Sequence, residues 1–378
     1  MNRRDLLKSI SLGLVATAVA PNLLSAKTSG FVSSLAPSKD NPLLLNFNEN
    51  SNGMSLKAKQ AVMDAMSLGF RYPDAQRDEL KEHISSYFYH GIKRSSVALG
   101  NGSSENIQAI VQALINKHKD VQLVFPTPTF DYAELYAKAQ GVKAIGVDLK
   151  KDFSFDVDKM KSIAKNFNGM TIFYLCNPNN PTATILSNNI LEDWIKSAPA
   201  NQFFLIDEAY ADFVVNPNFK SAIKFVKDGC ENVAVTRTFS KLYGLAGFRV
   251  GYSISSEKNT KDFTDFLAID NINLFGAVAA LESMKDKAFI AHSKKANEIS
   301  RKIVTDVLDK FGLKYAESNA NFIFHEVKGN VKDYQAKMKE HHVYVGREFA
   351  PITNYNRLTL GTPDEMKAFV KVFNEVMK

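Results

Sequence analysis

Several features that would place this chain in a special class are absent from its sequence. It has only two cysteines, Cys176 and Cys230, which lie far apart and lack the spacing of metal-binding or redox pairs. No stretch holds the roughly 20 uninterrupted apolar residues that a membrane-spanning helix needs. There is no internal repeat and no low-complexity tract. We therefore expect a globular protein with buried, apolar cysteines, no metal site, and no membrane association in the mature form.

A concentrated block of positive charge is also absent, although the net charge is +7. The 47 lysines and arginines are spread along the whole chain among 40 acidic residues. A nucleic-acid footprint would gather basic residues on one face or one helix, so a solvated lysine-rich surface explains the pattern better. We expect small molecules, including anionic ones, as ligands and no nucleic acid. The 378 residues suffice for a large core and two domains.

The N-terminus has the layout of an export signal. The paired Arg3 and Arg4 precede an apolar run that extends over residues 10–24. The order Arg-Arg-Asp-Leu-Leu-Lys resembles a twin-arginine signal. We therefore expect residues 1–26 to be a signal and the mature protein to be periplasmic. The alternative is an uncleaved N-terminal helix on a cytoplasmic protein, and the sequence does not define one cleavage site.

Between residues 70 and 255, short apolar runs alternate with amphipathic helical patterns. The expected buried strands are residues 121–125, 171–176, 203–206, 233–236 and 250–254. Residues 129–140 and 191–196 have helical patterns. This alternation predicts an α/β domain with a mostly parallel sheet between two layers of helices.

The segment after residue 275 has a different pattern, which predicts a smaller α+β domain. Helix-like stretches flank strand-like ones: helices at residues 276–303 and 363–378, and strands at 311–318, 321–327 and 343–346. We expect a large domain over residues 54–275 and a small C-terminal domain over residues 276–378. Residues 27–53 should form an N-terminal arm, in which residues 43–53 are extended or a loop rather than a core strand.

Polar motifs follow four of the expected strands. They are "PTPTF", "NPNNPT", "DEAY" and "RTFSK", in chain order. Because ligands bind beyond the carboxyl ends of strands in open α/β sheets, these four loops should meet at one site. A fifth motif, "GNGSSE" at residues 100–105, is a glycine turn before a helix. The N–H groups at such a helix start suit an anion.

The combination of groups in these motifs fits pyridoxal phosphate. This cofactor needs a lysine for its aldehyde, a carboxylate for its ring nitrogen, donors for its phenolic oxygen, and hydroxyls, N–H groups and an arginine for its phosphate. Lys241, Asp207 and Arg249 supply the charged groups. Singly, each has an ordinary explanation, such as a solvated lysine, a helix cap or a surface ion pair. Together, at strand ends, they favour one cofactor site.

The motifs also carry a resemblance to a known family. The chain resembles fold-type I pyridoxal-phosphate aminotransferases (class I/II), in the branch around histidinol-phosphate aminotransferase. The matching stretches are "LNFNEN" (45–50), "YPD" (72–74), "GNGSSE" (100–105), "PTF" (128–130), "NPNNPT" (177–182), "DEAYADF" (207–213), "RTFSKLYGLAGFRVGY" (237–252) and "RLTLGTPDE" (357–365). The resemblance implies an aspartate aminotransferase-like α/β domain with a mostly parallel sheet, plus a smaller α+β domain.

The resemblance also implies roles for individual residues. Lys241 would form the Schiff base and later move the proton, Asp207 would face the pyridinium nitrogen, and Tyr210 would hold the phenolic oxygen; these three form the catalytic set. The other residues implied to bind the cofactor are Ser103, Ser104, Phe130, Asn180, Thr238, Ser240 and Arg249.

Three further residues are implied to act at the edges of this site. Arg357 and Asn48 would bind the substrate, and Tyr72 would reach the cofactor phosphate from a neighbouring subunit. A site that uses Tyr72 of a neighbouring subunit implies that the protein is a homodimer.

The reaction implied is ping-pong transfer of an amino group from an amino acid or amino-alcohol phosphate to a 2-oxo acid. Histidinol phosphate is a candidate donor, but an exported enzyme does not suit cytoplasmic histidine synthesis, so the donor stays open. The sequence departs from the family where Ala183 replaces a usual glycine and Ser104 a common aspartate, and Arg347 lies close to the expected substrate-phosphate arginine. A decarboxylase or C–S lyase on the same fold, or a non-catalytic pyridoxal-phosphate-binding protein, are the alternatives.

Overall fold

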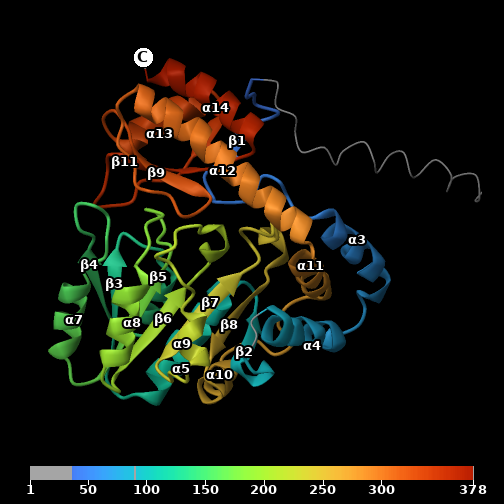
Figure 1. Ribbon diagram of the computed structural model, residues 1–378, viewed down its shortest axis with the longest axis vertical. Helices are drawn as coiled ribbons and strands as arrows, with labels where there is room; N and C mark the ends of the chain where they lie inside the picture. The colour runs from blue at the N-terminus through green and yellow to red at the C-terminus, as the bar shows by residue number, and fades with distance from the viewer. Residues whose placement is uncertain (1–35, 89–90, 378) are drawn as a thin grey trace, which may run out of the picture.

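The computed structural model describes residues 36–88 and 91–377 (Figure 1). The expected export signal, residues 1–26, lies outside this part of the chain. No helix within the two described ranges has the length and apolar character needed to cross a membrane.

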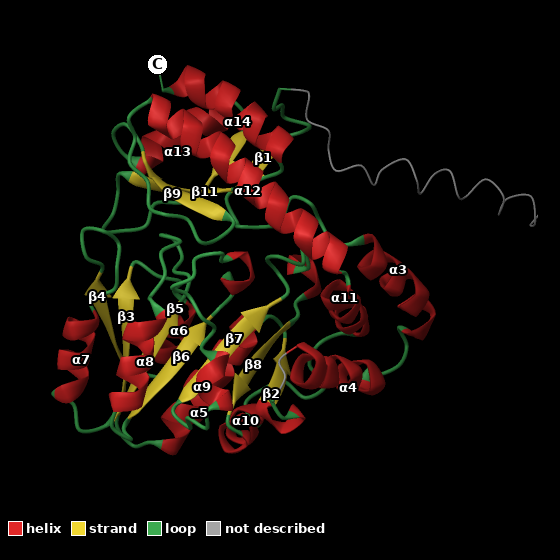
Figure 2. Cartoon of the chain, viewed as in Figure 1, coloured by secondary structure: helices red, strands yellow, loops and turns green. Residues whose placement is uncertain are grey.

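A seven-stranded sheet forms the centre of the larger part of the molecule (Figure 2). The strand order is β2-β8-β7-β6-β5-β3-β4. The strands are β2 (Val97–Gly100), β3 (Val121–Thr127), β4 (Lys143–Asp148), β5 (Met170–Cys176), β6 (Gln202–Asp207), β7 (Val233–Thr238) and β8 (Gly251–Ser255). Strands β3 to β7 are parallel, whereas β8 is antiparallel to both β7 and β2. The predicted mostly parallel sheet is therefore confirmed.

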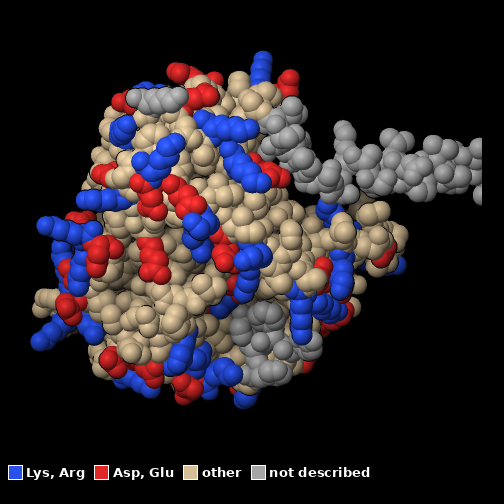
Figure 3. Space-filling view, turned by 45° about the horizontal axis from the view of Figure 1, so that its top comes forward, with Lys and Arg blue, Asp and Glu red and all other residues tan. Residues whose placement is uncertain are grey.

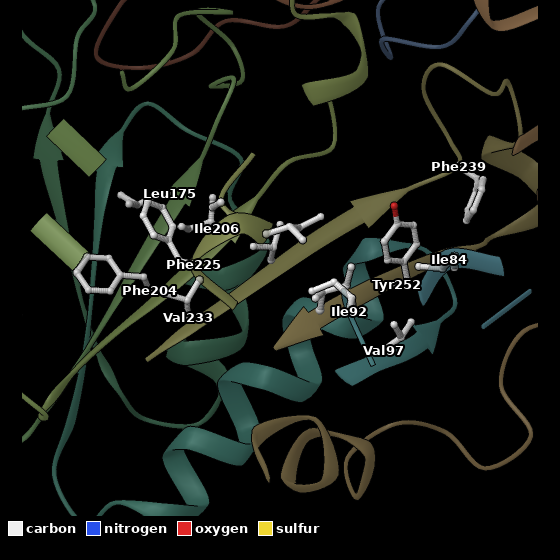
Figure 4. Close-up of a cluster of buried hydrophobic side chains, with 14 of the residues drawn as sticks. Ile84, Ile92, Val97, Leu175, Phe204, Ile206, Phe225, Val233, Phe239 and Tyr252 are labelled. Atoms are coloured by element: carbon white, nitrogen blue, oxygen red, sulfur yellow. The ribbon is translucent and has the colours of Figure 1, made fainter. Parts of the chain in front are cut away.

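Alternate residues of the central strands enter two separate cores, one on each face of the sheet. On β5, Ile172 and Tyr174 belong to one core, while Phe173 and Leu175 belong to the other. Figure 4 shows part of the second core, where Phe204, Ile206 and Val233 lie close to one another. Full burial of such a side chain contributes roughly 1.5–3 kcal/mol. Both faces are therefore apolar, which explains why these strands read as continuous hydrophobic runs.

Helices cover both faces of this sheet. They are α5 (Ser103–Lys117), α6 (Tyr132–Ala139), α7 (Val157–Lys165), α8 (Asn188–Ser197), α9 (Ile223–Lys227) and α10 (Glu257–Thr264). The helix expected over residues 129–140 begins only at Tyr132, because residues 128–131 form the turn that leaves β3.

A smaller unit lies beyond the carboxyl ends of β3 and β4 (Figure 1). Its two short sheets pair β9 (Phe322–Glu326) with β11 (Tyr355–Thr359), antiparallel, and β1 (Leu43–Leu45) with β10 (Val343–Val345), parallel. Its helices are α12 (Lys287–Lys310), α13 (Val331–Glu340) and α14 (Pro363–Val376).

Three expectations for this region were wrong. Residues 43–45 form strand β1, whose Leu43 and Leu45 are buried in the core of the smaller unit, rather than an arm or loop. Their pairing partner lies about 300 residues later, so no local pattern reveals it. Residues 276–303 are not one helix, because Asp286 ends one helix and its side chain caps the next. Residues 311–318 form only one isolated bridge, at Tyr315.

Helix α11 (Leu274–Lys285) packs against α3 (Leu56–Ala65) and α4 (Asp74–Glu82) at one side of the large sheet. Its Ala277, Ala280 and Met284 belong to the core beside that sheet. The long α12 then connects to the smaller unit (Figure 1). The domain limits expected from the sequence stay a prediction.

Charged side chains of both signs are interspersed on the face of the molecule in Figure 3. Basic and acidic groups lie beside one another there, with uncharged surface between them. This face has the mixed charge of an ordinary solvated surface.

Candidate active site

A pocket of about 450 Å³ lies where the loops after β5, β6 and β7 meet the smaller unit. Its lining residues come from distant parts of the chain: Phe47, Asn48, Glu49, Ser103, Ser104, Phe130, Tyr132, Asn180, Asp207, Ala209, Tyr210, Thr238, Ser240, Lys241, Ala246, Arg249 and Arg357. Every site residue expected from the sequence is among them except Tyr72. The carboxyl ends of parallel strands thus meet in one pocket, as the strand-end argument requires.

Lys241 lies in the loop after β7, and its environment keeps more of its amine neutral near pH 8 than in an ordinary lysine. Its Nζ donates a hydrogen bond to the carbonyl of Phe47 at 3.0 Å. Burial lowers the pKa of Lys241 to about 8, and the cation of Arg357 acts in the same direction against the opposing Glu49 and Asp207. A large share of the amine is therefore neutral near pH 8.

Asp207 ends β6 and is a buried carboxyl group with neutral hydrogen-bond partners. It accepts from Tyr174 Oη at 3.0 Å, Thr236 Oγ1 at 3.1 Å and the Ala209 N–H at 3.2 Å. Burial raises the pKa of Asp207 to about 6 despite these three bonds. A cationic ligand nitrogen beside it would favour the carboxylate form.

Sequence reasoning did not single out Tyr174 or Thr236. Thr236 is the register partner of Asp207 on the neighbouring strand, and Tyr174 lies two residues before the partner on the other side. Strand register across β5, β6 and β7 would have pointed to both.

Tyr210 follows β6, and two asparagine amides fix its hydroxyl group. Its Oη accepts from Asn48 Nδ2 at 3.1 Å and from Asn180 Nδ2 at 3.5 Å. Burial raises the pKa of Tyr210, which keeps the phenol protonated. Because both amides use Oη as an acceptor, the phenolic proton can be donated to a ligand oxygen.

The turn before α5 and the segment after β7 form a cradle of anion-binding groups. Thr238 Oγ1 donates to Ser240 Oγ at 2.9 Å, and the backbone of Ser103 begins α5. The guanidinium of Arg249 lies against Gly102, which has φ +79°. A Cβ on Gly102 would lie 2.4 Å from Arg249 Nη2, so the close approach requires glycine.

Arg357, on β11, is the cation of the smaller unit in this pocket. It is 8% exposed; its Nη1 donates to Asn180 Oδ1 at 2.8 Å and its Nη2 to the carbonyl of Asn46. Its Nε–H has no partner within the described part of the chain. Burial lowers the pKa of Arg357 to about 10, so it stays charged at neutral pH. A planar guanidinium of this kind binds carboxylates and phosphates with two parallel hydrogen bonds.

Tyr72 is the one expected site residue that the structure does not bring into the pocket. It precedes α4 and is 76% exposed on the surface of this single chain. Among the departures from the family, Ala183 has φ +59°, so it keeps the left-handed backbone that glycine favours. Arg347 pairs with Asp131 at 3.1 Å and does not line the pocket.

Five lining residues had no role in the expected site: Phe47, Glu49, Tyr132, Ala209 and Ala246. All but Tyr132 lie inside the motifs "LNFNEN", "DEAYADF" and "RTFSKLYGLAGFRVGY", which located these residues without giving them a role.

The model of the family "Aminotransferase class I and II" matches residues 40–373. The chain belongs to this family. Histidinol-phosphate aminotransferase of Moorella thermoacetica is 32% identical over 87% of this chain and 84% of its own length. The match of the family model and of these relatives makes the chain a pyridoxal-phosphate-dependent aminotransferase.

Solved structures show the same fold. A protein of Erwinia carotovora atroseptica SCRI1043, provisionally named a histidinol-phosphate aminotransferase, aligns with a TM-score of 0.87 at 40% identity, over 90% of this chain and 97% of its own. Histidinol-phosphate aminotransferase of Sinorhizobium meliloti, solved in complex with pyridoxal 5'-phosphate, aligns with a TM-score of 0.81 at 21% identity, over 89% of this chain and 90% of its own. The fold is that of the fold-type I aminotransferases.

The chemistry of the pocket fits pyridoxal phosphate. A lysine with a lowered pKa suits the aldehyde, and a buried carboxyl group with neutral partners, Asp207, suits a ring nitrogen that becomes cationic. Because Gly102 has no Cβ, Arg249 can lie against the turn that begins α5. An arginine beside the N–H groups of a helix start suits a phosphate.

Proposed function

We propose that the pocket transfers an amino group between a small amino donor and a 2-oxo acid, with histidinol phosphate as one candidate donor. The observation that carries the proposal is that Lys241, Asp207 and Arg357 line a single pocket. They supply a base, a counter-charge for the cofactor ring and an anion-binding group. The name of the Moorella thermoacetica relative supports histidinol phosphate as a donor.

Each charged or polar residue of the pocket would have its own role in the reaction. Pyridoxal phosphate, when bound, supplies an aldehyde for the donor amine and a ring that withdraws electrons from the donor's α-carbon. Lys241 would hold the aldehyde through Nζ, and the same Nζ, when free and neutral, would accept the proton of the donor's α-carbon and later give it up again. Its lowered pKa keeps the freed amine neutral enough for this task. Asp207 would hold the ring nitrogen in its protonated form, and Tyr210 would donate to the phenolic oxygen.

Arg357 orients the donor. Its guanidinium suits the α-carboxylate of an amino acid, and it suits equally the phosphate of an amino-alcohol phosphate. The pocket therefore accommodates both donor classes with one cation. Ser103, Ser104, Thr238, Ser240 and Arg249 would bind the cofactor phosphate. Phe130 would lie against the ring, and Asn48 and Asn180 support Tyr210.

A spectroscopic assay of each half-reaction tests the proposal. Purified protein receives amino acids and phosphorylated amino alcohols one at a time, and the absorbance of the bound cofactor is followed. At least one donor should convert the cofactor to its amine form, and 2-oxoglutarate should restore it. A cofactor that keeps its spectrum with every donor, or a donor that releases carbon dioxide instead, would contradict amino transfer. Lys241→Ala is the matched control and should show no conversion.

We also propose that the enzyme is a homodimer in which Tyr72 reaches the partner's site. Support comes from a run of exposed apolar side chains in the N-terminal part of the described chain: Leu44, Phe47, Leu56, Met63, Met66, Leu68, Phe70 and Tyr72. An apolar surface of this kind is typical of an interface.

Mixing two inactive variants tests the shared site. In a dimer of Lys241→Ala with Tyr72→Ala, one site carries both changes and the other carries neither. Activity that appears on mixing and exceeds that of either variant alone supports the proposal. No gain, or a monomer by sedimentation, would contradict it.

Finally, we propose that the twin-arginine-type signal exports the folded enzyme to the periplasm. The support is the Arg3-Arg4 pair ahead of the apolar run. Fractionation of cells that produce the full chain should place it in the periplasm, and the double variant Arg3→Lys, Arg4→Lys should stay in the cytoplasm. Equal distribution of both proteins would overturn the proposal.

A further inference from the structure

Residues 268–273, in the loop between α10 and α11, form hydrogen bonds to the segments that carry the phosphate cradle and do not line the pocket. Asn271 Nδ2 donates to the carbonyl of Leu99 at 2.7 Å, at the end of β2. The Ile272 N–H donates to Asn101 Oδ1 at 3.2 Å. Together with the bond from Asn273 described next, these bonds connect the loop to both segments that carry the cradle.

Two of these contacts converge on Arg249. Asn273 Nδ2 donates to the carbonyl of Phe248 at 2.9 Å, directly before Arg249 in the chain. The carbonyl of Asn101 accepts from Arg249 Nη2 at 3.2 Å, while the side chain of Asn101 is held by the loop. The loop therefore fixes both the backbone of Arg249 and the carbonyl that its guanidinium uses.

Glu105, in the first turn of α5, joins the same parts together. Its Oε2 accepts from the Asn101 N–H at 2.5 Å and from Asn271 Nδ2 at 3.2 Å. Its Oε1 accepts from the Ala268 N–H at 3.2 Å. One carboxylate thus links the glycine turn, the start of α5 and the 268–273 loop.

The backbone of this region is strained at the same places. Ile272 has φ +53° and Arg249 has φ +54°, which is the left-handed region that side chains with a Cβ rarely adopt. For a β-branched residue such as Ile272 this conformation is especially unfavourable, and surrounding contacts must hold it. The side chain of Asn101 bonds to Ile272 itself, and the side chain of Asn273 bonds to the carbonyl of Phe248, directly before Arg249.

We propose that the 268–273 loop positions Arg249 for the cofactor phosphate, with Asn273 and Asn101 as positioning residues. The inference rests on the proposed function, since it takes Arg249 to be the phosphate-binding arginine. A guanidinium gains most from a phosphate when its orientation is fixed before binding. Loosening the loop should therefore weaken the grip on the phosphate and leave contacts to the cofactor ring unchanged.

Asn273→Ser is the sharpest variant, because it separates two tasks of one side chain. Asn273 also caps α11, where its Oδ1 accepts from the Gly276 N–H at 2.7 Å. Serine caps helices about as well as asparagine, but its shorter side chain carries no amide to reach Phe248. Asn330→Ser is the matched control, since Asn330 caps α13 in the other unit in the same way.

The measurement is the affinity of the full chain, freed of cofactor, for pyridoxal 5'-phosphate and for pyridoxal, which lacks the phosphate. Asn273→Ser should bind pyridoxal 5'-phosphate about tenfold more weakly, as expected for one lost hydrogen bond that orients a charge. The affinity of this variant for pyridoxal should stay within about twofold of the wild-type value, because pyridoxal has no phosphate for Arg249 to bind. A tenfold loss would correspond to a whole hydrogen bond. Asn330→Ser should match the wild type for both ligands. Asn101→Ala tests the second link and should behave like Asn273→Ser.

Three results would overturn the inference. If Asn273→Ser bound both ligands more weakly by the same factor, the loop would support the fold in general. If it bound both as tightly as the wild type, Arg249 would need no support from the loop. If the wild-type protein bound pyridoxal as tightly as pyridoxal 5'-phosphate, the cradle would not bind the phosphate. The part of the proposed function on which this inference rests would then be wrong. The first two results leave the proposed function intact.

Discussion

The side-chain amide of Asn180 joins Arg357 to Tyr210. Its Oδ1 accepts from Arg357 Nη1 at 2.8 Å, and its Nδ2 faces Tyr210 Oη at 3.5 Å. Arg357 belongs to β11 of the smaller unit and Tyr210 to the loop after β6 of the large sheet. One amide therefore fixes the anion-binding cation relative to the cofactor-binding phenol.

Replacing this amide should weaken donor binding more than it slows the chemical step. In Asn180→Ala, Arg357 loses the partner that orients Nη1, so we expect KM for the amino donor to rise about tenfold with a smaller change in kcat. Steady-state kinetics against donor concentration measure both. Asn216→Ala is the control, since its amide pairs with Glu317 away from the pocket. A fall in kcat with unchanged KM would contradict this role.

The turn at Gly102 should tolerate no side chain. In Gly102→Ala the new Cβ would lie 2.4 Å from Arg249 Nη2 at a φ of +79°. We expect the affinity for pyridoxal 5'-phosphate to fall by about tenfold or more, because the guanidinium must move away from the cradle. Fluorescence titration of the cofactor-free protein measures the affinity.

Gly141→Ala is the control that separates strain from the clash. Gly141 has φ +74° and open space around its missing Cβ. Both variants should lose about 1 kcal/mol of folding free energy or more from the left-handed backbone. Only Gly102→Ala should lose cofactor affinity, and equal affinity in both variants would argue against the cradle.

The pH dependence of cofactor capture should report the lowered pKa of Lys241. Only the neutral amine attacks the aldehyde, so the capture rate should rise with pH up to about 8 and then level off. An ordinary lysine, with a pKa near 10.4, would give a rate that still rises above pH 9. Stopped-flow absorbance after mixing cofactor-free protein with pyridoxal 5'-phosphate measures it. Arg357→Met should move the midpoint upward, since the Arg357 cation helps to lower this pKa.

His325 should make the protein sensitive to acid. Burial lowers the pKa of His325 to about 4, while the unfolded chain keeps a value near 6.5. Between these values the unfolded state binds more protons, so the stability present above pH 6.5 is lost as the pH falls toward 4, by about 3 kcal/mol at most.

Urea unfolding at a series of pH values tests this expectation. The Nε2 of His325 has no hydrogen-bond partner in the described part of the chain, and the ring packs against Tyr334 and Phe373. Phenylalanine therefore suits this site, and His325→Phe is the variant to compare. The variant should lose less stability than the wild type between pH 6.5 and 4. Parallel curves for the two proteins would show that His325 does not titrate on unfolding.

The large sheet could be predicted from the sequence because its strands are buried on both faces. Runs such as residues 172–176 are continuously apolar, and each is followed by polar residues at its carboxyl end. Strand β1 could not be predicted, since Leu43 and Leu45 pair with a strand near the other end of the chain. The break between α11 and α12 depends on one residue, Asp286, inside an otherwise helical pattern.

The pocket could be predicted for a similar reason. Lys241, Asp207 and Arg357 lie in motifs whose residue types the cofactor chemistry requires. The groups that hold Asp207 could not be predicted, because Tyr174 and Thr236 reach it through the register of strands β5, β6 and β7. The bonds from the 268–273 loop to Asn101 and Phe248 likewise join segments about 25 to 170 residues apart. Each bond uses one backbone group, the Ile272 N–H or the Phe248 carbonyl, and a sequence does not show which backbone groups pair.

The most direct test of the account is to identify the amine that holds the cofactor. Enzyme loaded with pyridoxal 5'-phosphate is reduced with borohydride, digested, and its labelled peptide is sequenced by mass spectrometry. The account predicts one labelled peptide, modified at Lys241, and none in Lys241→Ala. Label on another lysine, or unchanged labelling of Lys241→Ala, would contradict it.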